Sequence, residues 1–192
     1  MADAVGEIVE ASLISFTAET PRDRLYEAPA FGSFVRSDDP DGALFAVVAS
    51  AETSSVEPNR RAAAFWQDEA ELRKSQPQIF ELLSTRFTAL ILGHLRDGTL
   101  RFHLPPRPPR VHGFVYECSA DEIRRVTGDP GILRPLLEAP TGCSDELVAA
   151  VLRHGAAFRE DGRKFLIAAG KELAVLLRDD YARLQAIIRK LE

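Results

Sequence analysis

Nucleotide chemistry would require a glycine-rich loop, and this sequence has two partial matches to one. A phosphate-binding loop has two glycines separated by four residues, then Lys and Ser or Thr, because backbone amides surround the phosphates while the lysine reaches them. Gly170-Lys171 is followed by Glu172, and Gly162-Arg163-Lys164 begins a charged helical segment. Neither segment has the full pattern, so we expect no ATP hydrolysis by this chain alone.

Histidine and cysteine residues give the spacing that most suggests a metal. His94, His103 and His112 follow one another at intervals of nine residues, and Cys118 is close behind. A zinc site is one interpretation, and histidines at strand ends with accidental spacing are the other. No Cys-x-x-Cys or His-x-x-x-His pair accompanies them, so we expect no metal. The Gly-x-Ser-x-Gly elbow of hydrolases is missing too, so we expect no catalytic residues, no enzyme activity and no cofactor.

The most distinctive polar segment covers residues 53–61, inside a stretch, 50–61, that we expect to be a loop because it is polar and contains Pro58. In one interpretation it binds a partner protein, with its arginines as bidentate donors to carboxylates. In the other its hydroxyls bond their own turn. The candidate partner-binding residues are Thr53, Ser54, Ser55, Glu57, Arg60 and Arg61.

A second candidate surface is a basic strip over residues 101–116. No acidic residue lies between Asp97 and Glu117, while arginines, histidines and aromatic residues alternate there. This pattern is typical of nucleic-acid contact, in which cations meet phosphates and rings stack on bases. The alternative is that the arginines are simply solvated on a proline-stiffened connector. The candidate nucleic-acid-binding residues are Arg101, Phe102, Arg107 and Arg110.

The elements that would position these residues are strands in the first part of the chain. Alternating apolar residues and Asp-Gly turns predict two hairpins, and four prolines in the PPRPPR run exclude that run from a sheet interior. The predicted segments are a strand or bent strand pair over 5–18, strands over 31–35 and 44–48 around a turn at 37–44, a short helix over 78–83, a hairpin over 87–104, an extended connector over 105–110 and a strand over 111–116.

Helices are predicted for the rest of the chain. Ser119 with Glu122 forms a capping-box pattern. Further helices are expected over 129–138 and 145–158, followed by one last helix from residue 161 or 162 to the C-terminus. The apolar stripe of this last helix lies either on the preceding helix or on a partner. Strands followed by helices argue against a βαβ sheet.

Charge and hydropathy exclude several function classes. The formal net charge of −5 argues against a general electrostatic grip on nucleic acid or on an anionic membrane. No apolar run approaches the roughly 18 residues of a spanning helix, so we expect no membrane insertion. The first residues have neither a basic nor an apolar signal-peptide region. Cys118 and Cys143 form no Cys-x-x-Cys pair, which favours a reducing, cytoplasmic location.

The order of these segments resembles the HAS barrel, the β-barrel domain shared by HerA-type DNA-translocating ATPases and by the N-terminal domain of ATP synthase α and β subunits. Together with GKELAVLLRDDYARL (170–184), the chain is similar to stand-alone HAS-barrel proteins of bacteria, which pair the barrel with a helical tail. The likeness is carried by VGEIVEASLISFTA (5–18), APAFGSFVRS (28–37), LFAVVASAETSSVEPNRRA (44–62), QPQIFELLSTRFTALILGH (76–94) and LPPRPPRVHGFVYECS (104–119).

The resemblance implies an α+β fold, with a small closed β-barrel of about six strands in residues 1–118 and a C-terminal helical segment in residues 119–192. In the ATPases this barrel contacts neighbouring ring subunits and performs no chemistry, and in the helicase type it helps dock a nuclease. We therefore expect a non-catalytic interaction or assembly subunit, an accessory partner of a hexameric HerA-like ATPase or its nuclease, or a homo-oligomer. A direct nucleic-acid-binding module using residues 101–116 is the alternative.

Overall fold

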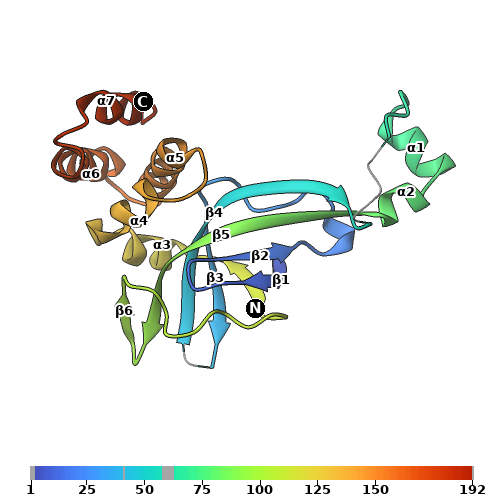
Figure 1. Cartoon of the computed structure of the whole chain (residues 1–192), viewed down its shortest axis with the longest axis horizontal. Coiled ribbons are helices and arrows are strands. Elements are labelled where there is room, and N and C mark those ends of the chain that lie inside the picture. The colour runs from blue at the N-terminus through green and yellow to red at the C-terminus, as the bar shows by residue number, and fades with distance from the viewer. Residues whose placement is uncertain (1–2, 41, 58–62, 192) are drawn as a thin grey trace.

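The chain forms a closed antiparallel β-barrel of six strands followed by a C-terminal helical segment, α3–α7, as the sequence predicted (Figure 1). The computed structural model describes residues 3–40, 42–57 and 63–191. The elements in chain order are β1 (Gly6–Ala11), β2 (Ser15–Glu19), η1 (Arg22–Arg24), β3 (Phe34–Asp39), β4 (Gly42–Ser55), α1 (Glu69–Ser75), α2 (Gln78–Glu81), β5 (Leu83–Arg96), β6 (Thr99–Arg101), β7 (Phe114–Glu117), α3 (Ala120–Val126), η2 (Pro130–Ile132), α4 (Leu133–Leu137), α5 (Ser144–Ala157), α6 (Gly162–Leu176) and α7 (Tyr181–Arg189).

The barrel closes in the order β2-β1-β7-β3-β4-β5, and β5 pairs back onto β2. Each pair of neighbouring strands is antiparallel, so short turns suffice to join β1 to β2 and β3 to β4. The predicted hairpin is confirmed, but the loop is shorter than residues 37–44, since Ser37 to Asp39 of β3 already pair with Gly42 to Leu44 of β4. Strand β6 pairs with β5 outside the closed ring and completes the second predicted hairpin.

Two apolar cores lie on the two sides of the barrel wall. The barrel interior is filled by residues from each of its six strands, namely Ile8, Phe16, Ala18, Val35, Ala46, Val48, Phe87, Ala89, Ile91 and Val115. The second core lies between the outer face of β3, β4 and β5 and the helical segment, and it includes Phe34, Phe45, Val47, Leu90, Leu92, Ile123, Leu136, Leu147, Val151 and Ile187. The parts of the chain before and after the boundary that we expect at residue 118 thus share one apolar core.

Residues 44–48 of β4 form a continuous apolar run, and the position of this strand between the two cores explains it. Successive side chains of a strand point to opposite faces. Ala46 and Val48 belong to the barrel interior, while Phe45 and Val47 belong to the core against the helices. Both faces are therefore buried, and an uninterrupted apolar sequence results.

The helical segment begins as the sequence predicted. Both hydrogen bonds of the Ser119–Glu122 capping box are present at the start of α3. The single last helix that we expected is wrong, because the chain breaks between α6 and α7. Asp180 causes the second start, since its carboxylate accepts a hydrogen bond from the Arg183 backbone amide at 3.0 Å.

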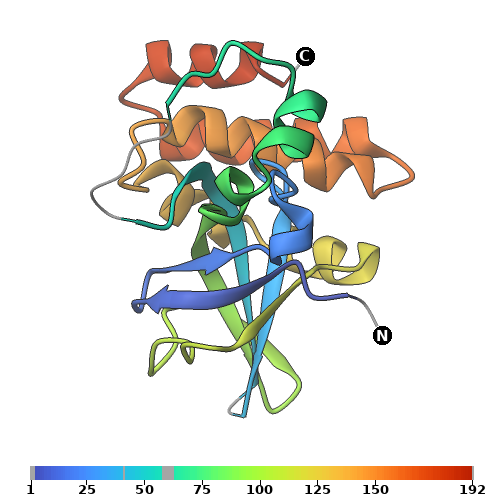
Figure 2. The ribbon, with the colours of Figure 1, turned by 90° about the vertical axis from the view of Figure 1, so that its right-hand side faces the viewer.

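Helix α7 lies back on its own chain rather than leaving its apolar stripe free. Ile187 is 0% exposed in the core shared with α5. The Arg183 guanidinium donates to the Asp145 carboxylate at 2.7 Å and to the Leu137 carbonyl at 2.8 Å. Of the two alternatives for this stripe, packing within the chain is the one that occurs. Figure 2 shows α5, α6 and α7 stacked to one side of the barrel strands.

Strands β4 and β5 continue well beyond the barrel. Their pairing extends to Ser55 opposite Leu83, and the Val56 amide donates to the Leu82 carbonyl at 2.8 Å. The connection between them includes α1 and α2, which lie at the end of this long hairpin, away from the helical segment (Figure 1). We call residues 56–82 the arm.

Candidate functional site

The polar segment predicted as a loop is in part a strand. Residues 50–55 belong to β4, so the loop prediction is wrong for them. Thr53 lies opposite Thr85 of β5, and their hydroxyl oxygens are 2.8 Å apart. Backbone pairing with β5 continues to Ser55, although residues 50–55 of β4 are largely exposed and belong to neither apolar core. The residues are polar for that reason, and a hydrophobic pattern cannot reveal the strand.

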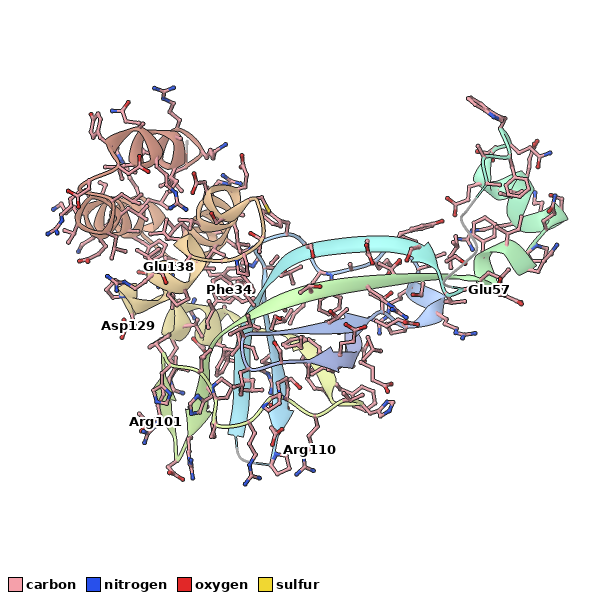
Figure 3. All side chains as sticks on the ribbon, viewed as in Figure 1. Phe34, Glu57, Arg101, Arg110, Asp129 and Glu138 are labelled. Carbon is pink, nitrogen blue, oxygen red and sulfur yellow. The ribbon has the colours of Figure 1, made fainter. Side chains whose placement is uncertain are left out.

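The remaining members of the partner-binding set lie where the strand ends. The Ser55 hydroxyl accepts a hydrogen bond from the Glu57 amide at 3.2 Å, a local turn of the kind that the plainer interpretation expected. Arg60 and Arg61 lie outside the described residues. The structure thus places Thr53, Ser54, Ser55 and Glu57 together at the base of the arm, and Figure 3 shows Glu57 at the far end of the hairpin.

The arm carries aromatic residues that the sequence analysis did not single out. Trp66 is 97% exposed, and Phe65 beside it is also exposed. Helices α1 and α2 contain no buried residue among those that the structure describes. Neither apolar core includes a described residue of the arm. A Phe-Trp pair within a polar stretch was the available sequence signal.

Local contacts hold the two arm helices. The Arg73 guanidinium lies 4.1 Å from the centre of the Phe80 ring and donates to the Glu69 carboxylate at 2.8 Å. The Asp68 carboxylate caps α1 by accepting from the Ala70 amide at 3.1 Å. Exposed ion pairs and caps of this kind stabilise a helix by about 1 kcal/mol or less each. Isolated helices shorter than about 12 residues are marginal in water, so these contacts leave the arm weakly stabilised on its own.

The predicted nucleic-acid strip is divided by the fold. Arg107 and Arg110 line a cavity of about 130 Å³ together with Arg96, whereas Arg101 is not part of its lining. Phe102 is half-buried against the core that β4 and β5 share with the helices. Burial there removes part of its ring from any contact with bases. Figure 3 shows Arg101 and Arg110 at the same end of the barrel, remote from Glu57.

The histidines do not gather into a metal site. The His94 and His103 rings meet edge to face with centroids 4.9 Å apart, but the His112 ring bonds Glu7 at 2.6 Å. Within the described ranges, no group of three His, Cys, Asp or Glu side chains is placed to hold a metal ion. Burial raises the pKa of the Cys118 thiol to about 12, so it is not a thiolate at neutral pH.

The environment of His94 is both buried and electropositive. Its side chain is 6% exposed, and burial is the largest cause that lowers its pKa. The positive charges of Arg101 and Arg96 lower this pKa further. His94 is therefore neutral near pH 7.

A larger cavity of about 460 Å³ lies in the helical segment, between η2, α5 and α6. Its apolar floor includes Ile132, Leu152 and Phe165. The Arg159 guanidinium carbon lies 4.0 Å from the centre of the Phe165 ring, and the guanidinium donates to the Gly155 carbonyl at 2.7 Å. Arg159 thus already has partners within the chain. The charged lining residues have mixed signs and select no ligand charge, namely Asp129, Arg159, Asp161, Lys164 and Glu172.

Comparisons with known proteins add no identity to this geometry. No protein-family model matches the chain. No curated protein matches it either. The barrel and its helical segment are therefore established by the structure, and the HAS-barrel resemblance stays a prediction. In the described part of the chain, no helix has the length and apolar character that crossing a bilayer requires.

Proposed function

We propose that this chain is a non-catalytic interaction subunit that holds a partner protein through its arm. The observation that carries the proposal is Trp66, which is 97% exposed in the arm that connects β4 to β5. Tryptophan is among the residues most enriched at binding hot spots, because it buries a large apolar area with few rotatable bonds. Leaving such a side chain in water gains nothing for the fold, so a partner is the simplest reason for its position.

The physical state of the arm supports the same proposal. Helices α1 and α2 have no fully buried residue among those described, and their apolar residues Leu72 and Phe80 are only half-buried. An amphipathic helix normally gains its stability by burying its apolar side. A partner surface that covers the arm would supply that burial, with Thr53 and Ser54 of β4 at its edge.

The second part of the proposal concerns the partner. We propose a ring-forming, HerA-like DNA-translocating ATPase, or the nuclease that works with it. Support comes from the order of sequence motifs that resembles the HAS barrel and from the six-stranded closed barrel that such motifs imply. In this arrangement the barrel supports the arm, and the arm contacts the partner.

The test is a pull-down from cells of the source organism, with nuclease added, read by mass spectrometry. Wild-type chain should recover a HerA-like ATPase or its nuclease in about equal amount, and Trp66→Ala should lose it. Tyr181→Ala is the matched control, because Tyr181 is also an exposed aromatic residue but lies on α7. Recovery of that partner by Trp66→Ala at the wild-type level would remove the arm from the proposal.

Direct nucleic-acid binding is the second candidate, and the meeting of Arg107, Arg110 and Arg96 around one cavity favours it. Replacing Arg101, Arg107 and Arg110 with Ala should then weaken binding of a single-stranded oligonucleotide and flatten its dependence on salt. A salt slope identical to that of wild-type chain would exclude this candidate. The arm variant should leave the slope unchanged, so the two functions are separable.

A further inference from the structure

The cavity that Arg96, Arg107 and Arg110 line has a built framework. It lies between the β3–β4 turn, the end of β5 and the proline-rich connector that precedes β7. Gly42 has a φ of 128°, and a side chain there would overlap the carbonyl oxygen of Leu95. Only glycine allows this close approach of the turn to β5. Asp39 and Gly42, at the facing ends of β3 and β4, therefore form one wall of the cavity.

Prolines form the opposite wall. Pro105, Pro106 and Pro108 line the cavity, and Pro105 is buried. Each proline ring fixes φ near −65°, so this part of the connector loses little conformational freedom when a ligand binds. The backbone that carries Arg107 and Arg110 is thus restricted before any ligand binds, while their side chains are exposed.

Charge gives the cavity a clear preference. Its described lining includes three arginines and one carboxylate, that of Asp39. In the described part of the chain, the guanidinium groups of Arg96, Arg107 and Arg110 form no ion pair and no hydrogen bond. Most other arginines do have such partners, for example Arg36 with Glu122 at 3.2 Å. Three arginines that line one cavity without such partners leave donors available for an anion.

Size limits the class of anion. The cavity holds about 130 Å³, whereas pockets for drug-sized ligands span about 300–1,000 Å³. A small group such as one tetrahedral oxyanion suits a cavity of this size.

We propose that this cavity binds a single phosphate group, with Arg107 and Arg110 as charge-assisted donors and Arg96 completing the positive lining. Arginine is the preferred side chain for such contacts because its planar fork donates two parallel hydrogen bonds to phosphate oxygens. His94 lines the same cavity and is neutral there, so it can donate or accept. The site is independent of the arm and of the partner proposed for it.

Titration with inorganic phosphate, followed by two-dimensional ¹H–¹⁵N NMR at constant ionic strength, tests the site. Saturable shifts are expected at the amides of Gly42, Arg96 and Arg110, and equimolar chloride should produce none. The double variant Arg107→Gln/Arg110→Gln should weaken binding by about tenfold or more, because each lost charge-assisted hydrogen bond removes a comparable factor.

Two further variants keep the result decisive. Arg163→Gln removes the same charge from α6, away from the cavity, and should bind phosphate as the wild-type chain does. Arg110→Lys keeps the charge but loses the fork, so intermediate affinity is expected. Unchanged spectra of the wild-type chain on adding phosphate, or equal losses in the Arg163 variant, would overturn the proposal.

The phosphate has two possible sources, a small phosphomonoester or the end of a nucleic acid. Adenosine 5′-monophosphate and a pair of otherwise identical oligonucleotides, one with a 5′-phosphate and one with a 5′-hydroxyl, separate them. Tighter binding of the phosphorylated oligonucleotide than of the mononucleotide assigns the site to nucleic-acid ends. Equal binding of both phosphates assigns it to small phosphomonoesters. If the wild-type chain binds inorganic phosphate but shows no salt-dependent binding of either oligonucleotide, the nucleic-acid function is rejected and the phosphate site in the cavity is supported.

Discussion

Removing the arm should leave the fold intact and should change the free energy of unfolding only slightly. Ser55 lies directly opposite Leu83 in the β4–β5 ladder. A two-residue Asn-Gly turn is the favoured connection for strands that end in this way. Replacing residues 56–82 with Asn-Gly therefore shortens the chain while β4 and β5 keep their positions.

The energetic terms point toward equal or higher stability. Described side chains of the arm contribute to neither apolar core, so the hydrophobic loss is small. Shortening a connection about tenfold lowers its closure cost by about 2 kcal/mol if the loop is flexible. Helices α1 and α2 order the residues within them, which reduces that gain. The free energy of unfolding should thus rise by about 0–2 kcal/mol.

Guanidinium chloride unfolding, followed by circular dichroism, measures this change. The slope of the transition should stay close to the wild-type value, since little surface buried in the folded state is removed. Ile187→Ala is the control for sensitivity, because Ile187 is 0% exposed and its truncation should cost about 2–5 kcal/mol. A loss of more than about 2 kcal/mol on removing the arm would mean that the arm stabilises the barrel, and the argument for an unpartnered arm would fail.

Three other predictions concern single residues. Burial lowers the pKa of His94 and of His154 below 6.5, so the unfolded chain binds more protons than the folded chain. The free energy of unfolding should therefore fall as pH drops below about 6.5, by at most about 1.4 kcal/mol per pH unit for each histidine. In urea unfolding, His154→Gln should show a weaker dependence of this free energy on pH, and an unchanged dependence would contradict the role of His154. Gly42→Ala should destabilise the chain by about 2 kcal/mol or more and Gly98→Ala by only about 1 kcal/mol, because both have positive φ but open space surrounds Gly98; equal melting temperatures would refute the crowding argument. The Cys118 thiol, with its pKa raised to about 12, should react slowly with iodoacetamide at pH 8 in the native chain and quickly in urea, and fast native alkylation would contradict its burial.

Much of the fold was predictable because its signals are local. The turn between β3 and β4 depends on Pro40 and on Gly42, which are visible in the sequence. The start of α3 depends on Ser119 and Glu122, three residues apart. The order of strands then helices follows from where the apolar period changes.

The length of β4 and β5 was not predictable in the same way. Hydrophobic patterns report burial, and residues 50–55 pair through their backbones without being buried. The break before α7 was visible only as an interruption of the apolar stripe by Asp179 and Asp180. Whether such an interruption ends a helix depends on the cap that forms, in this case with the Arg183 amide.

The candidate sites were predictable only in part, because convergence of side chains is a tertiary property. The sequence indicated Arg107 and Arg110 from the local lack of acids, but Arg96 joins them from the end of β5. Phe102 alternates with arginines in the sequence, yet it packs toward the helices. Trp66 was passed over because composition alone does not show that its side chain is 97% exposed.

The two-sided burial of β4 also affects how its alignment with β5 is fixed. A strand with one apolar and one polar face resists a shift of one residue, because the shift would put polar side chains into the core. Between residues 44 and 48 both faces are apolar, so hydrophobicity does not penalise a shift, and side-chain size must do so. Phe45 in place of Ala46 would overfill the barrel. The irregular pairings after Phe45 and after Val48 and the crowded Gly42 restrict the remaining freedom, so the order of large and small side chains along β4 helps to fix its alignment with β5.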